Sequence, residues 1–341
     1  MFIVCIILNK QGLKVAITGF ETHDGAISNL KNKLTMLGID AKIIKDAKDM
    51  SNVDFVLVLG GDKGILHYFH KIDTDSPPVV GIYESDSTGF LAQIDAREIK
   101  DAINRLKRGD YDIDEVTRIA VKIDGREVEP ALNDVAIFPS RSAILMEHKL
   151  RINGEDIWHD NSDGIVIATP IGSTAYSMSA GGPMVLRGSK VFVIVSINSI
   201  DVTRRPLIVS DDSNIEIDDI ISRYHCEVIL DGDKRIRVKK KVTCFKHEHP
   251  AKLIKFANQT VSLIAKKVKL AEDMLGMPPS AKLVLKILEY EGPMSQRDLA
   301  DRTMLPERTV RLALSHLLNK GYVKKRVSLR DARQRIYELK L

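Results

Sequence analysis

The sequence predicts three parts: an α/β N-terminal domain, an antiparallel β-rich domain and a small winged helix domain. Strand and helix patterns alternate up to about residue 110, which is typical of an open sheet covered by helices. Turn pairs then recur at Asp124-Gly125, Asn153-Gly154 and Asp231-Gly232, and such pairs supply the positive φ angles of tight hairpins. A compact helical segment follows the proline-containing residues 276–279.

Length and composition fit a globular protein of two or three domains. The chain has 341 residues and a mass of 38.1 kDa, with 44% hydrophobic and 28% charged residues. No apolar run approaches the ~20 residues of a membrane helix, and residues 1–8 resemble a strand more than a signal peptide. Three cysteines, Cys5, Cys226 and Cys244, are too few for a disulfide framework, so we expect a cytoplasmic protein.

Residues 1–110 form the predicted α/β nucleotide-binding domain. Buried strands are expected at residues 13–18, 41–44, 53–59 and 78–83, and helical spacing of apolar residues is found between residues 27 and 37. A second helix is expected over residues 96–107, ended by Gly109.

Residues 111–275 form the predicted β-rich domain. Residues 116–123 alternate between apolar and polar side chains, and the three turn pairs named above each lie between strand-like runs. A helix is expected at the end of this part, over residues 260–275.

Residues 280–341 follow the order of a winged helix-turn-helix. Ser280 is the expected cap of a first helix, and Ser295 with Asp298 resembles the capping box of a second. A third helix begins at Pro306-Glu307 and ends at Gly321, and two short strands follow at residues 322–327 and 335–339.

Charge is unevenly distributed along the chain. Residues 280–341 hold 14 Lys and Arg against 7 Asp and Glu, which leaves 37 against 39 for the rest of a chain with net charge +5. The basic end favours double-stranded DNA as a partner, although a module for oligomerisation is an alternative. The candidate DNA-binding side chains on the third helix and the hairpin are Arg308, Thr309, Arg311, Ser315, Asn319, Lys324, Lys325, Arg326, Arg330, Arg333 and Arg335.

Four features of the larger body could carry chemistry. A buried strand is followed by Gly60-Gly61-Asp62-Lys63-Gly64. The glycines would let the backbone, and the start of the next helix, approach a phosphate group. The alternative is a plain strand-to-helix turn capped by Asp62. Asn133-Asp134 enters a β-rich run as an edge turn or as a pair that holds sugar hydroxyls. Residues 163–183 are rich in glycine and hydroxyl side chains, which permits a ligand to lie against the backbone, and residues 230–232 read as a hairpin turn.

At these residues the chain resembles the NAD kinase family over roughly residues 10–275. The family carries a Gly-Gly-Asp loop, an Asn-Glu/Asp pair and a long D-G-x-x-x-x-T-P-x-G-S-T-A-Y-x-x-S-A-G-G-P segment, which residues 163–183 match almost throughout. The segments from Arg205-Pro206 and from Leu230 also fall in the family's order. The resemblance implies transfer of a phosphoryl group to the 2′-hydroxyl of the adenosine ribose of NAD.

The resemblance also implies roles for individual residues. Asp62 would take the hydroxyl proton or bind Mg²⁺, with ATP or polyphosphate as the phosphoryl donor. The remaining nucleotide- and phosphate-binding residues would be Gly60, Gly61, Lys63, Gly64, Phe90, Asn133, Asp134, Asp163, Thr174, Ala175, Tyr176 and Ser179. Family members are usually dimers or tetramers, so a homo-oligomer is expected.

The sequence departs from the family pattern at the phosphate loop and beside it. Lys63 and Gly64 stand where the family has Gly and Thr, so that Lys63 either pairs with phosphate or obstructs it. Tyr83 replaces an Asn, and Ile171 stands where a hydroxyl residue is usual. An alternative is therefore a catalytically impaired domain that acts as an NAD(P)-sensing transcriptional regulator.

Metal-ligating residue types gather near the end of the β-rich part. His225, Cys226, Cys244, His247 and His249 lack a Cys-x-x-Cys pair, so we predict no metal site there.

Overall fold

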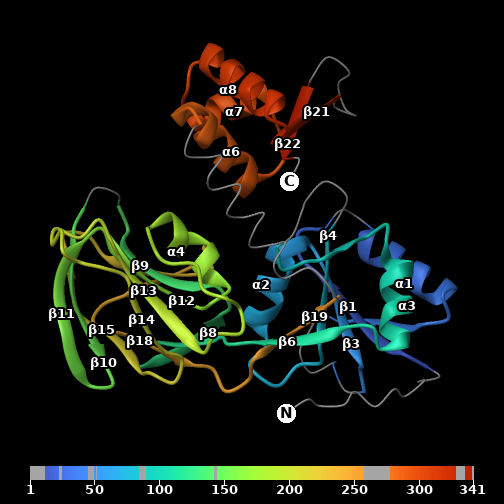
Figure 1. Cartoon of the computed structure of the whole chain (residues 1–341), viewed down its shortest axis with the longest axis horizontal. Helices are drawn as coiled ribbons and strands as arrows, with labels where there is room; N and C mark the ends of the chain where they lie inside the picture. Colours follow the sequence, from blue (N-terminus) through green and yellow to red (C-terminus); the bar gives the residue numbers. More distant parts are fainter. Residues whose placement is uncertain are drawn as a thin grey trace.

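A computed structural model describes residues 12–22, 25–44, 50, 52–83, 90–141, 144–256, 277–327 and 335–339. Figure 1 shows an α/β unit, a β-rich unit and a C-terminal unit of helices with a small hairpin. This arrangement confirms the predicted fold class. The expected strand at residues 1–8 and the expected helix at residues 260–275 lie outside the described residues.

The α/β unit is built on a seven-stranded sheet with the order β2-β1-β3-β4-β19-β6 and with β5 beside β4. Its strands are β1 (Lys14–Gly19), β2 (Asp40–Ile43), β3 (Phe55–Leu59), β4 (Val79–Tyr83), β5 (Ile94–Asp95), β6 (Asp112–Val116) and β19 (Ala251–Lys255). Its helices are α1 (Ala26–Met36), α2 (Gly61–Lys71) and α3 (Ile99–Arg108). All five residues of β3 are buried, as expected for a central parallel strand.

This sheet takes strands from both sides of the β-rich part. β19 runs parallel to β4 and antiparallel to β6, with Ala251 opposite Val116. In Figure 1 the orange β19 lies among the blue strands of the α/β unit. The sheet therefore includes β6, which lies after the predicted boundary at residue 110. It also includes β19, which begins at residue 251, after the strands of the β-rich unit.

The β-rich unit consists of two six-stranded antiparallel sheets, with orders β11-β10-β15-β18-β7-β8 and β14-β13-β12-β9-β16-β17. The first contains β7 (Ile119–Ile123), β8 (Arg126–Ala131), β10 (Met146–Ile152), β11 (Glu155–Ser162), β15 (Ile215–Ser222) and β18 (Val242–Lys246). The second contains β9 (Asp134–Pro139), β12 (Gly164–Ala168), β13 (Val191–Ile197), β14 (Leu207–Ser210), β16 (Cys226–Leu230) and β17 (Lys234–Val238). A short 3-10 turn, η2 (Gly172–Thr174), and the helix α4 (Tyr176–Ser179) follow β12.

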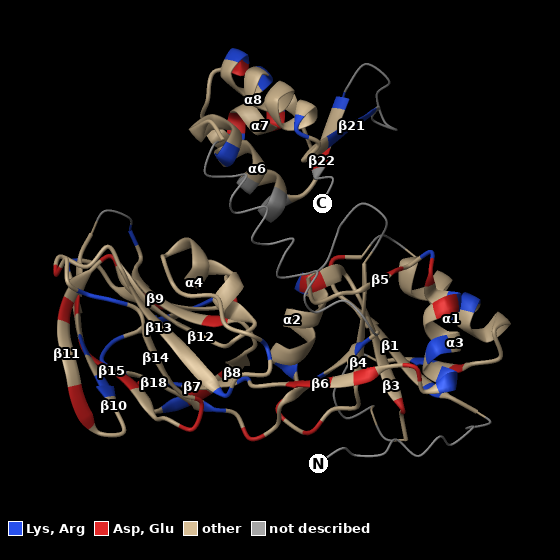
Figure 2. Ribbon diagram, in the orientation of Figure 1, with Lys and Arg blue, Asp and Glu red and all other residues tan. Residues whose placement is uncertain are grey.

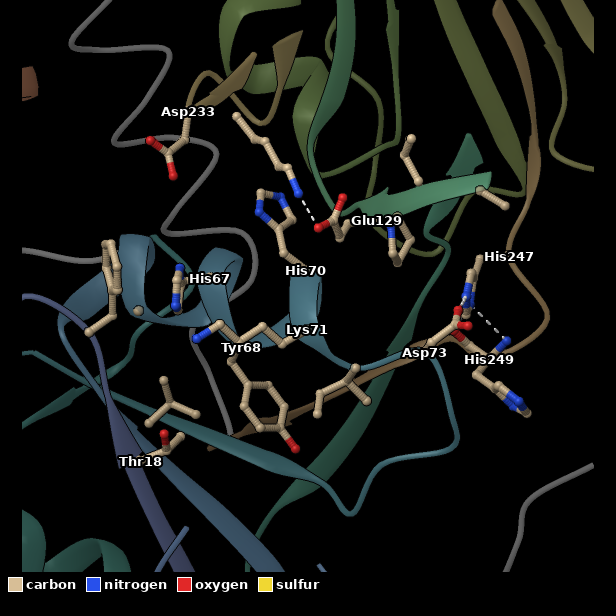
Figure 3. A pocket seen from close by; sticks show the side chains of 18 of the residues that line it. Thr18, His67, Tyr68, His70, Lys71, Asp73, Glu129, Asp233, His247 and His249 are labelled. Carbon is tan, nitrogen blue, oxygen red and sulfur yellow. Dashed lines mark hydrogen bonds and ion pairs between the residues drawn. The ribbon is translucent and has the colours of Figure 1, made fainter. Parts of the chain in front are cut away.

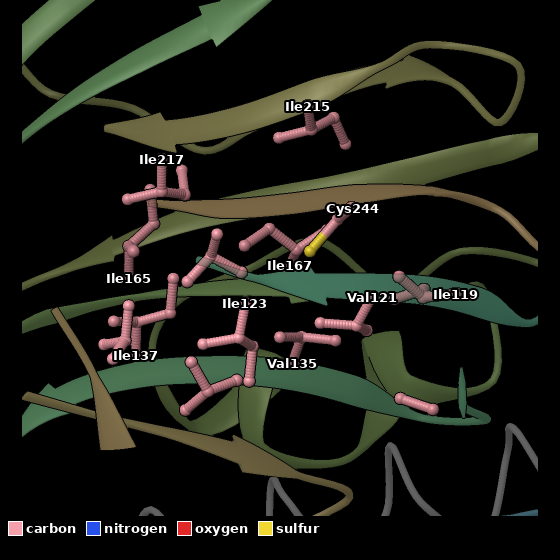
Figure 4. Packing of buried hydrophobic residues seen from close by; sticks show 14 of the residues in the cluster. Ile119, Val121, Ile123, Val135, Ile137, Ile165, Ile167, Ile215, Ile217 and Cys244 are labelled. Atoms are coloured by element: carbon pink, nitrogen blue, oxygen red, sulfur yellow. The ribbon is translucent and has the colours of Figure 1, made fainter. Parts of the chain in front are cut away.

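Alternation along the strands creates the core between these two sheets. Val121 and Ile123 of β7, and Val135 and Ile137 of β9, are all at most 4% exposed and belong to one hydrophobic cluster (Figure 4). The predicted turn residues Asp124, Asn153 and Asp231 have φ near +50°, and each is followed by a glycine of positive φ. Tight turns therefore set the register of these hairpins, as expected from the sequence.

The C-terminal unit has its own core, formed by its three helices and the hairpin. Its elements are α6 (Pro279–Glu291), β20 (Met294–Ser295), α7 (Gln296–Thr303), α8 (Glu307–Asn319), β21 (Val323–Val327) and β22 (Arg335–Leu339). The Ser295–Asp298 capping box is present, but Ser280 lies inside α6 and caps nothing, since the N-cap is Pro278. The strand β20 was not predicted; it pairs with β22 and completes a three-stranded sheet.

Candidate active site and DNA-binding face

The Gly-Gly-Asp loop joins β3 to α2 at the carboxyl end of the central strand. Gly60 has φ of 108°, and a Cβ there would lie 2.2 Å from the carbonyl oxygen of Phe20, so only glycine fits. Gly61 opens α2 with φ of 65°, in the left-handed region as well. The loop thus brings backbone close to the space beyond β3, where ligands bind in open α/β sheets.

Asp62 is held by the backbone that follows the loop after β4. Its Oδ2 accepts a hydrogen bond from the N–H of Phe90 at 2.8 Å. Its Oδ1 accepts hydrogen bonds from the N–H groups of Leu91 at 2.8 Å and Ala92 at 2.9 Å. Phe90 and Asp62 are therefore neighbours in the structure. Because Oδ2 takes one of these three bonds and Oδ1 takes two, Oδ2 is the oxygen better able to accept a further hydrogen bond.

The two departures in this loop have different structural consequences. Lys63 is exposed and points to Glu21, with Nζ 3.7 Å from the Glu21 carboxylate, so its side chain does not fill the loop. Gly64 is buried against β3, where a Cβ would lie 2.4 Å from the carbonyl oxygen of Leu59. In this packing a threonine cannot replace Gly64 without moving α2.

The Asn133-Asp134 turn is anchored by Asp231, which the sequence suggested was only a hairpin residue. The Asp231 carboxylate accepts the backbone N–H groups of Leu132, Asn133 and Asp134 at 2.9, 2.7 and 3.0 Å. Its Oδ2 also lies 2.7 Å from Nε2 of His70 on α2. The hairpin turn is confirmed, but its aspartate also joins the β-rich unit to the α/β unit.

Asp134 itself is 3% exposed. Burial is the larger cause, and the charge of Asp231 the smaller, of a pKa of Asp134 raised to about 8. A hydrogen bond from the backbone N–H of Tyr176 to the carboxyl group acts in the opposite direction and lowers the pKa. Asp134 is therefore mostly protonated at neutral pH. A neutral carboxyl group can donate a hydrogen bond as well as accept one, which suits a hydroxyl group or a base nitrogen.

The segment after β12 packs directly on this turn. Thr169 donates from Oγ1 to the carbonyl oxygen of Leu132 at 2.7 Å, and its N–H donates to that of Asn133 at 2.9 Å. A Cβ on Gly172 would lie 1.8 Å from the same Asn133 oxygen, so this glycine is required by close approach. Ile171 is 5% exposed in a cluster with Ile65 and other residues of both larger units, and packing explains its apolar side chain.

Further candidate residues lie along the outer face of the sheet that contains β9 and β12. Asp134 and Phe138 share this face because strand residues alternate, and the ring of Phe138 lies 5.9 Å from that of Tyr176. Gly164 has no side chain and so leaves room for the ring of Phe138. The neighbouring Asp163 accepts a hydrogen bond from Nδ2 of Asn198 at 2.8 Å. Thr174 and Ala175 are half-buried, while Tyr176 and Ser179 are exposed on α4.

Two arginines near these residues were missed by sequence reasoning. Arg187 donates to the Phe90 carbonyl oxygen at 2.8 Å, so it ties the β-rich unit to the loop that holds Asp62. Burial lowers the pKa of Arg187. Arg118 is 1% exposed and its Nη2 donates to the carbonyl oxygens of Phe69 and Ile72 at the end of α2. No local motif marks either residue.

A cavity of about 1360 Å³ runs along another face of α2 (Figure 3). Of the predicted nucleotide residues only Gly64 lines it, so it is distinct from the Asp62 and Asn133 region. His247 and His249 lie on its wall, and His247 pairs with Asp73 at 2.9 Å. Among the described residues no three His, Cys, Asp or Glu side chains form a group that could hold a metal ion.

The two described cysteines are structural. Cys226 and Cys244 are both free and lie in the core between the two sheets. Burial raises the pKa of the Cys244 thiol to about 12, which makes it unreactive. In the same described part of the chain no helix is long and apolar enough to cross a membrane.

The candidate DNA-binding face is carried by α8 and the hairpin after it (Figure 2). Its exposed side chains include Arg308, Arg311 and Ser315 on α8, whereas Thr309 is half-buried. On the hairpin, Lys324 and Arg326 pair with the buried Glu338 at 3.3 and 3.0 Å. Lys325 and Arg335 are exposed, and Asn319 ends α8, but Arg330 and Arg333 lie outside the described residues.

The α/β unit presents the glycine backbone at the start of α2, and the β-rich unit presents the polar Asn133-Asp134 turn. α2 connects the two, because His70 in its last turn contacts Asp231. Transfer of a phosphoryl group mainly requires that donor and acceptor be positioned and that charge be stabilised. The fold and the site therefore define a two-domain nucleotide kinase with an attached winged helix.

Comparison with known proteins identifies the family. The ATP-NAD kinase N-terminal domain matches residues 10–111, and the ATP-NAD kinase C-terminal domain matches residues 132–256. Together they cover more than half of the chain, which therefore belongs to the NAD kinase family. The MarR family matches residues 275–334, which confirms the C-terminal winged helix.

Individual relatives agree with this assignment. The NAD kinase of Methanopyrus kandleri is 33% identical over 223 residues, or 65% of this chain and 80% of the relative. The NAD kinase of Thermoplasma acidophilum is 33% identical over 224 residues, 64% of this chain and 81% of the relative. The crystal structure of an NAD kinase from Archaeoglobus fulgidus in complex with ATP covers 75% of this chain and 98% of its own, with 25% identity and a TM-score of 0.65.

Proposed function

We propose that this chain transfers the terminal phosphoryl group of ATP to the 2′-hydroxyl of the adenosine ribose of NAD, and so makes NADP. The observation that carries this proposal is α2, which starts at the Gly-Gly-Asp loop and contacts Asp231 beside Asn133-Asp134 at its other end. Donor and acceptor sites are thereby held by one helix. The relatives named NAD kinase, and the related kinase structure in complex with ATP, support the choice of both substrates.

Each side chain then has a physical role in the proposed reaction. Asp62 accepts the proton of the 2′-hydroxyl at Oδ2, the oxygen with only one backbone partner. Asn133 and the protonated Asp134 bind the ribose and base, and Tyr176 covers the nucleotide beside Phe138. The amides of Gly60, Gly61 and the first turn of α2 face the phosphates.

Magnesium is expected as part of the substrate, because ATP is used as its Mg²⁺ complex. Asp62 lies at the start of α2 with its carboxylate held by three backbone N–H groups. If Asp62 contacts the Mg²⁺ of the ATP complex, the ion would neutralise charge on the phosphates, and the same carboxylate would still face the hydroxyl acceptor.

Variants of Asp62 test the proposed chemistry. Asp62→Asn keeps the shape of the side chain and one acceptor oxygen, which can still accept the hydrogen bonds from Leu91 and Ala92, but the amide cannot take a proton. We therefore expect NADP formation to fall at least 100-fold, within the about 10²–10⁴-fold contribution of a general base. Binding of NAD should change little. If Asp62→Asn retains wild-type turnover, Asp62 is not the base.

We further propose that the winged helix binds double-stranded DNA through α8 and the hairpin. Arg308 and Arg311 project from the exposed side of α8, and the charge excess of residues 280–341 favours a polyanion. An anisotropy titration with duplex DNA at several salt concentrations tests this. Binding that does not weaken with salt would contradict it, and would favour a module for oligomerisation.

The specific arrangement around Asp62 also favours a sensing role beside catalysis. Asp62 is hydrogen-bonded to Phe90, and Arg187 of the β-rich unit donates to the Phe90 carbonyl oxygen, so a nucleotide at Asp62 would lie beside a contact between the two units. We propose that NAD or NADP changes DNA affinity by about 5–150-fold, the usual range of coupling between sites. Equal DNA affinity with and without saturating nucleotide would exclude this role.

We also propose that the chain forms a homo-oligomer. Large apolar side chains are exposed near β14 and in the segments before it, where a second copy can cover them, and they are Met184, Leu186, Ile200, Val202 and Ile208. Light scattering of the purified chain should give a mass at least twice that of one chain. A Val202→Asp variant should then be smaller in mass, and a monomeric wild type would contradict the proposal.

A further inference from the structure

Asp231 is the point at which the nucleotide turn meets α2. Its carboxylate is fully buried, with one bond to the N–H of Leu132 at Oδ2 and two to the N–H groups of Asn133 and Asp134 at Oδ1. His70 approaches the same Oδ2 to 2.7 Å. Four donors therefore surround the two oxygens, which is the full acceptor capacity of an ionised carboxylate.

His70 is the one side chain among these four donors. It lies in the last turn of α2 with 8% exposure, and Nε2 carries the hydrogen because the carboxylate can only accept. The other groups that face it are His67, one turn earlier on α2, and Glu129 of β8, which is paired with Lys234. His70 is thus bound to the carboxylate that anchors the nucleotide turn.

We infer that His70 is a positioning residue for NAD: through Asp231 it fixes the Asn133-Asp134 turn at a set distance from the Gly-Gly-Asp loop. The inference rests on the proposed kinase function. Asp62 and His70 are eight residues apart on one helix, which places them roughly 12 Å apart along its axis. The helix acts as a spacer, and His70 is its contact with the ribose-binding turn.

Loss of this donor has two consequences. Asp231 keeps its three backbone bonds but loses the only partner that belongs to α2, so the turn is no longer fixed relative to the phosphate loop. The negative charge of Asp231 also loses the hydrogen bond from His70 that stabilises it. This charge already raises the pKa of Asp134, and its effect on that pKa should become larger. NAD should bind more weakly, and protonation of Asp134 should persist to higher pH.

The test compares His70→Ala with His70→Gln in the full chain. The amide nitrogen of glutamine can reach the place of Nε2 and donate to Asp231, whereas alanine cannot. We expect His70→Ala to weaken NAD binding about tenfold, as expected for loss of a hydrogen bond to a charged group. His70→Gln should restore binding to within about threefold, and the KM for ATP should change less than about twofold in both.

The pH profile separates positioning from a general loss of structure. The basic limb of the profile of NAD affinity reports Asp134, and it should move to higher pH in His70→Ala but not in His70→Gln. His159→Gln is the matched control, because His159 is exposed on β11 and pairs with the partly exposed Glu147 at 2.8 Å. This control should keep wild-type affinity.

Three outcomes overturn the inference. Wild-type NAD affinity in His70→Ala excludes a role for His70, and equal loss in His70→Ala and His70→Gln excludes the hydrogen bond as its cause. An unchanged pH profile in His70→Ala excludes the link to Asp134. Failure of the kinase proposal is distinguishable, because NAD binding is measured directly: a wild type that binds NAD without making NADP refutes the kinase function while the affinities still decide on His70.

Discussion

Replacement of Asp134 by asparagine should make the stability of the protein less dependent on pH. The carboxyl group of Asp134 is buried and its pKa is raised from 3.8 to about 8, so the folded state binds this proton more tightly than the unfolded chain does. Stability from the bound proton is therefore fully present below about pH 4 and is lost as the pH rises through about 8. Asp134→Asn keeps the shape of the side chain and removes the titration.

The magnitude follows from the two pKa values. One pKa unit corresponds to about 1.4 kcal/mol, so at pH 7 the wild type has lost on the order of 4 kcal/mol relative to acid pH through this group. Between pH 6 and pH 8 the loss is on the order of 2 kcal/mol. Other titrating groups are common to both proteins, and their contribution cancels when the two pH profiles are subtracted.

Urea unfolding of wild type and Asp134→Asn, followed at pH 6, 7 and 8, measures this difference. We expect the free energy of unfolding of the wild type to fall by about 2 kcal/mol more than that of the variant over this interval. Asp163→Asn is a suitable control, because Asp163 is only half-buried and bonds to Asn198. Parallel profiles for wild type and Asp134→Asn would refute the assigned protonation.

Three further predictions concern the packing and the DNA face. Gly172→Ala places a Cβ 1.8 Å from the Asn133 carbonyl oxygen and should lower the melting temperature and the NAD affinity, while Gly188→Ala, with open space around its Cβ, should not. Arg118→Met removes a buried donor to the end of α2 and should cost about 3 kcal/mol in urea unfolding, a loss that an unchanged midpoint would contradict. Arg308→Ala and Arg311→Ala should each reduce the slope of log affinity against log salt by about 1, and an unchanged slope would remove these residues from the DNA contact.

Local patterns in the sequence were sufficient for most elements. The buried strand β3, the end of α3 at Gly109, the tight turns and the Ser295 capping box are set by neighbours within a few residues, so periodicity and turn chemistry predict them. Ser280 was misassigned because proline at the start of α6 replaced the expected cap. Which residue begins a helix is decided by one or two backbone angles that the pattern does not specify.

Long-range pairing could not be predicted in the same way. β19 joins a sheet whose other strands precede residue 117, and no local signal specifies such a neighbour. His70 and Asp231 are 161 residues apart and meet only in the folded chain. The same is true of Arg187 and Phe90, so the Gly-Gly-Asp loop and the Asn-Asp pair were visible in the sequence, while the residues that position them were not.

The departures from the family pattern also depend on packing for their interpretation. Lys63 could have blocked the phosphate loop, but it extends to Glu21. Ile171 replaces a hydroxyl residue because its side chain lies in an apolar cluster between the two larger units. Both changes are thereby accommodated without filling the site, which supports an active enzyme.

The most direct test of the kinase assignment is the formation of NADP by the purified full chain. Wild-type protein is incubated with NAD and ATP in the presence of Mg²⁺, and NADP is measured with a dehydrogenase that uses only NADP. We predict steady formation of NADP that depends on ATP and is lost in Asp62→Asn. Absence of NADP from a folded wild-type protein that binds NAD would contradict the assignment.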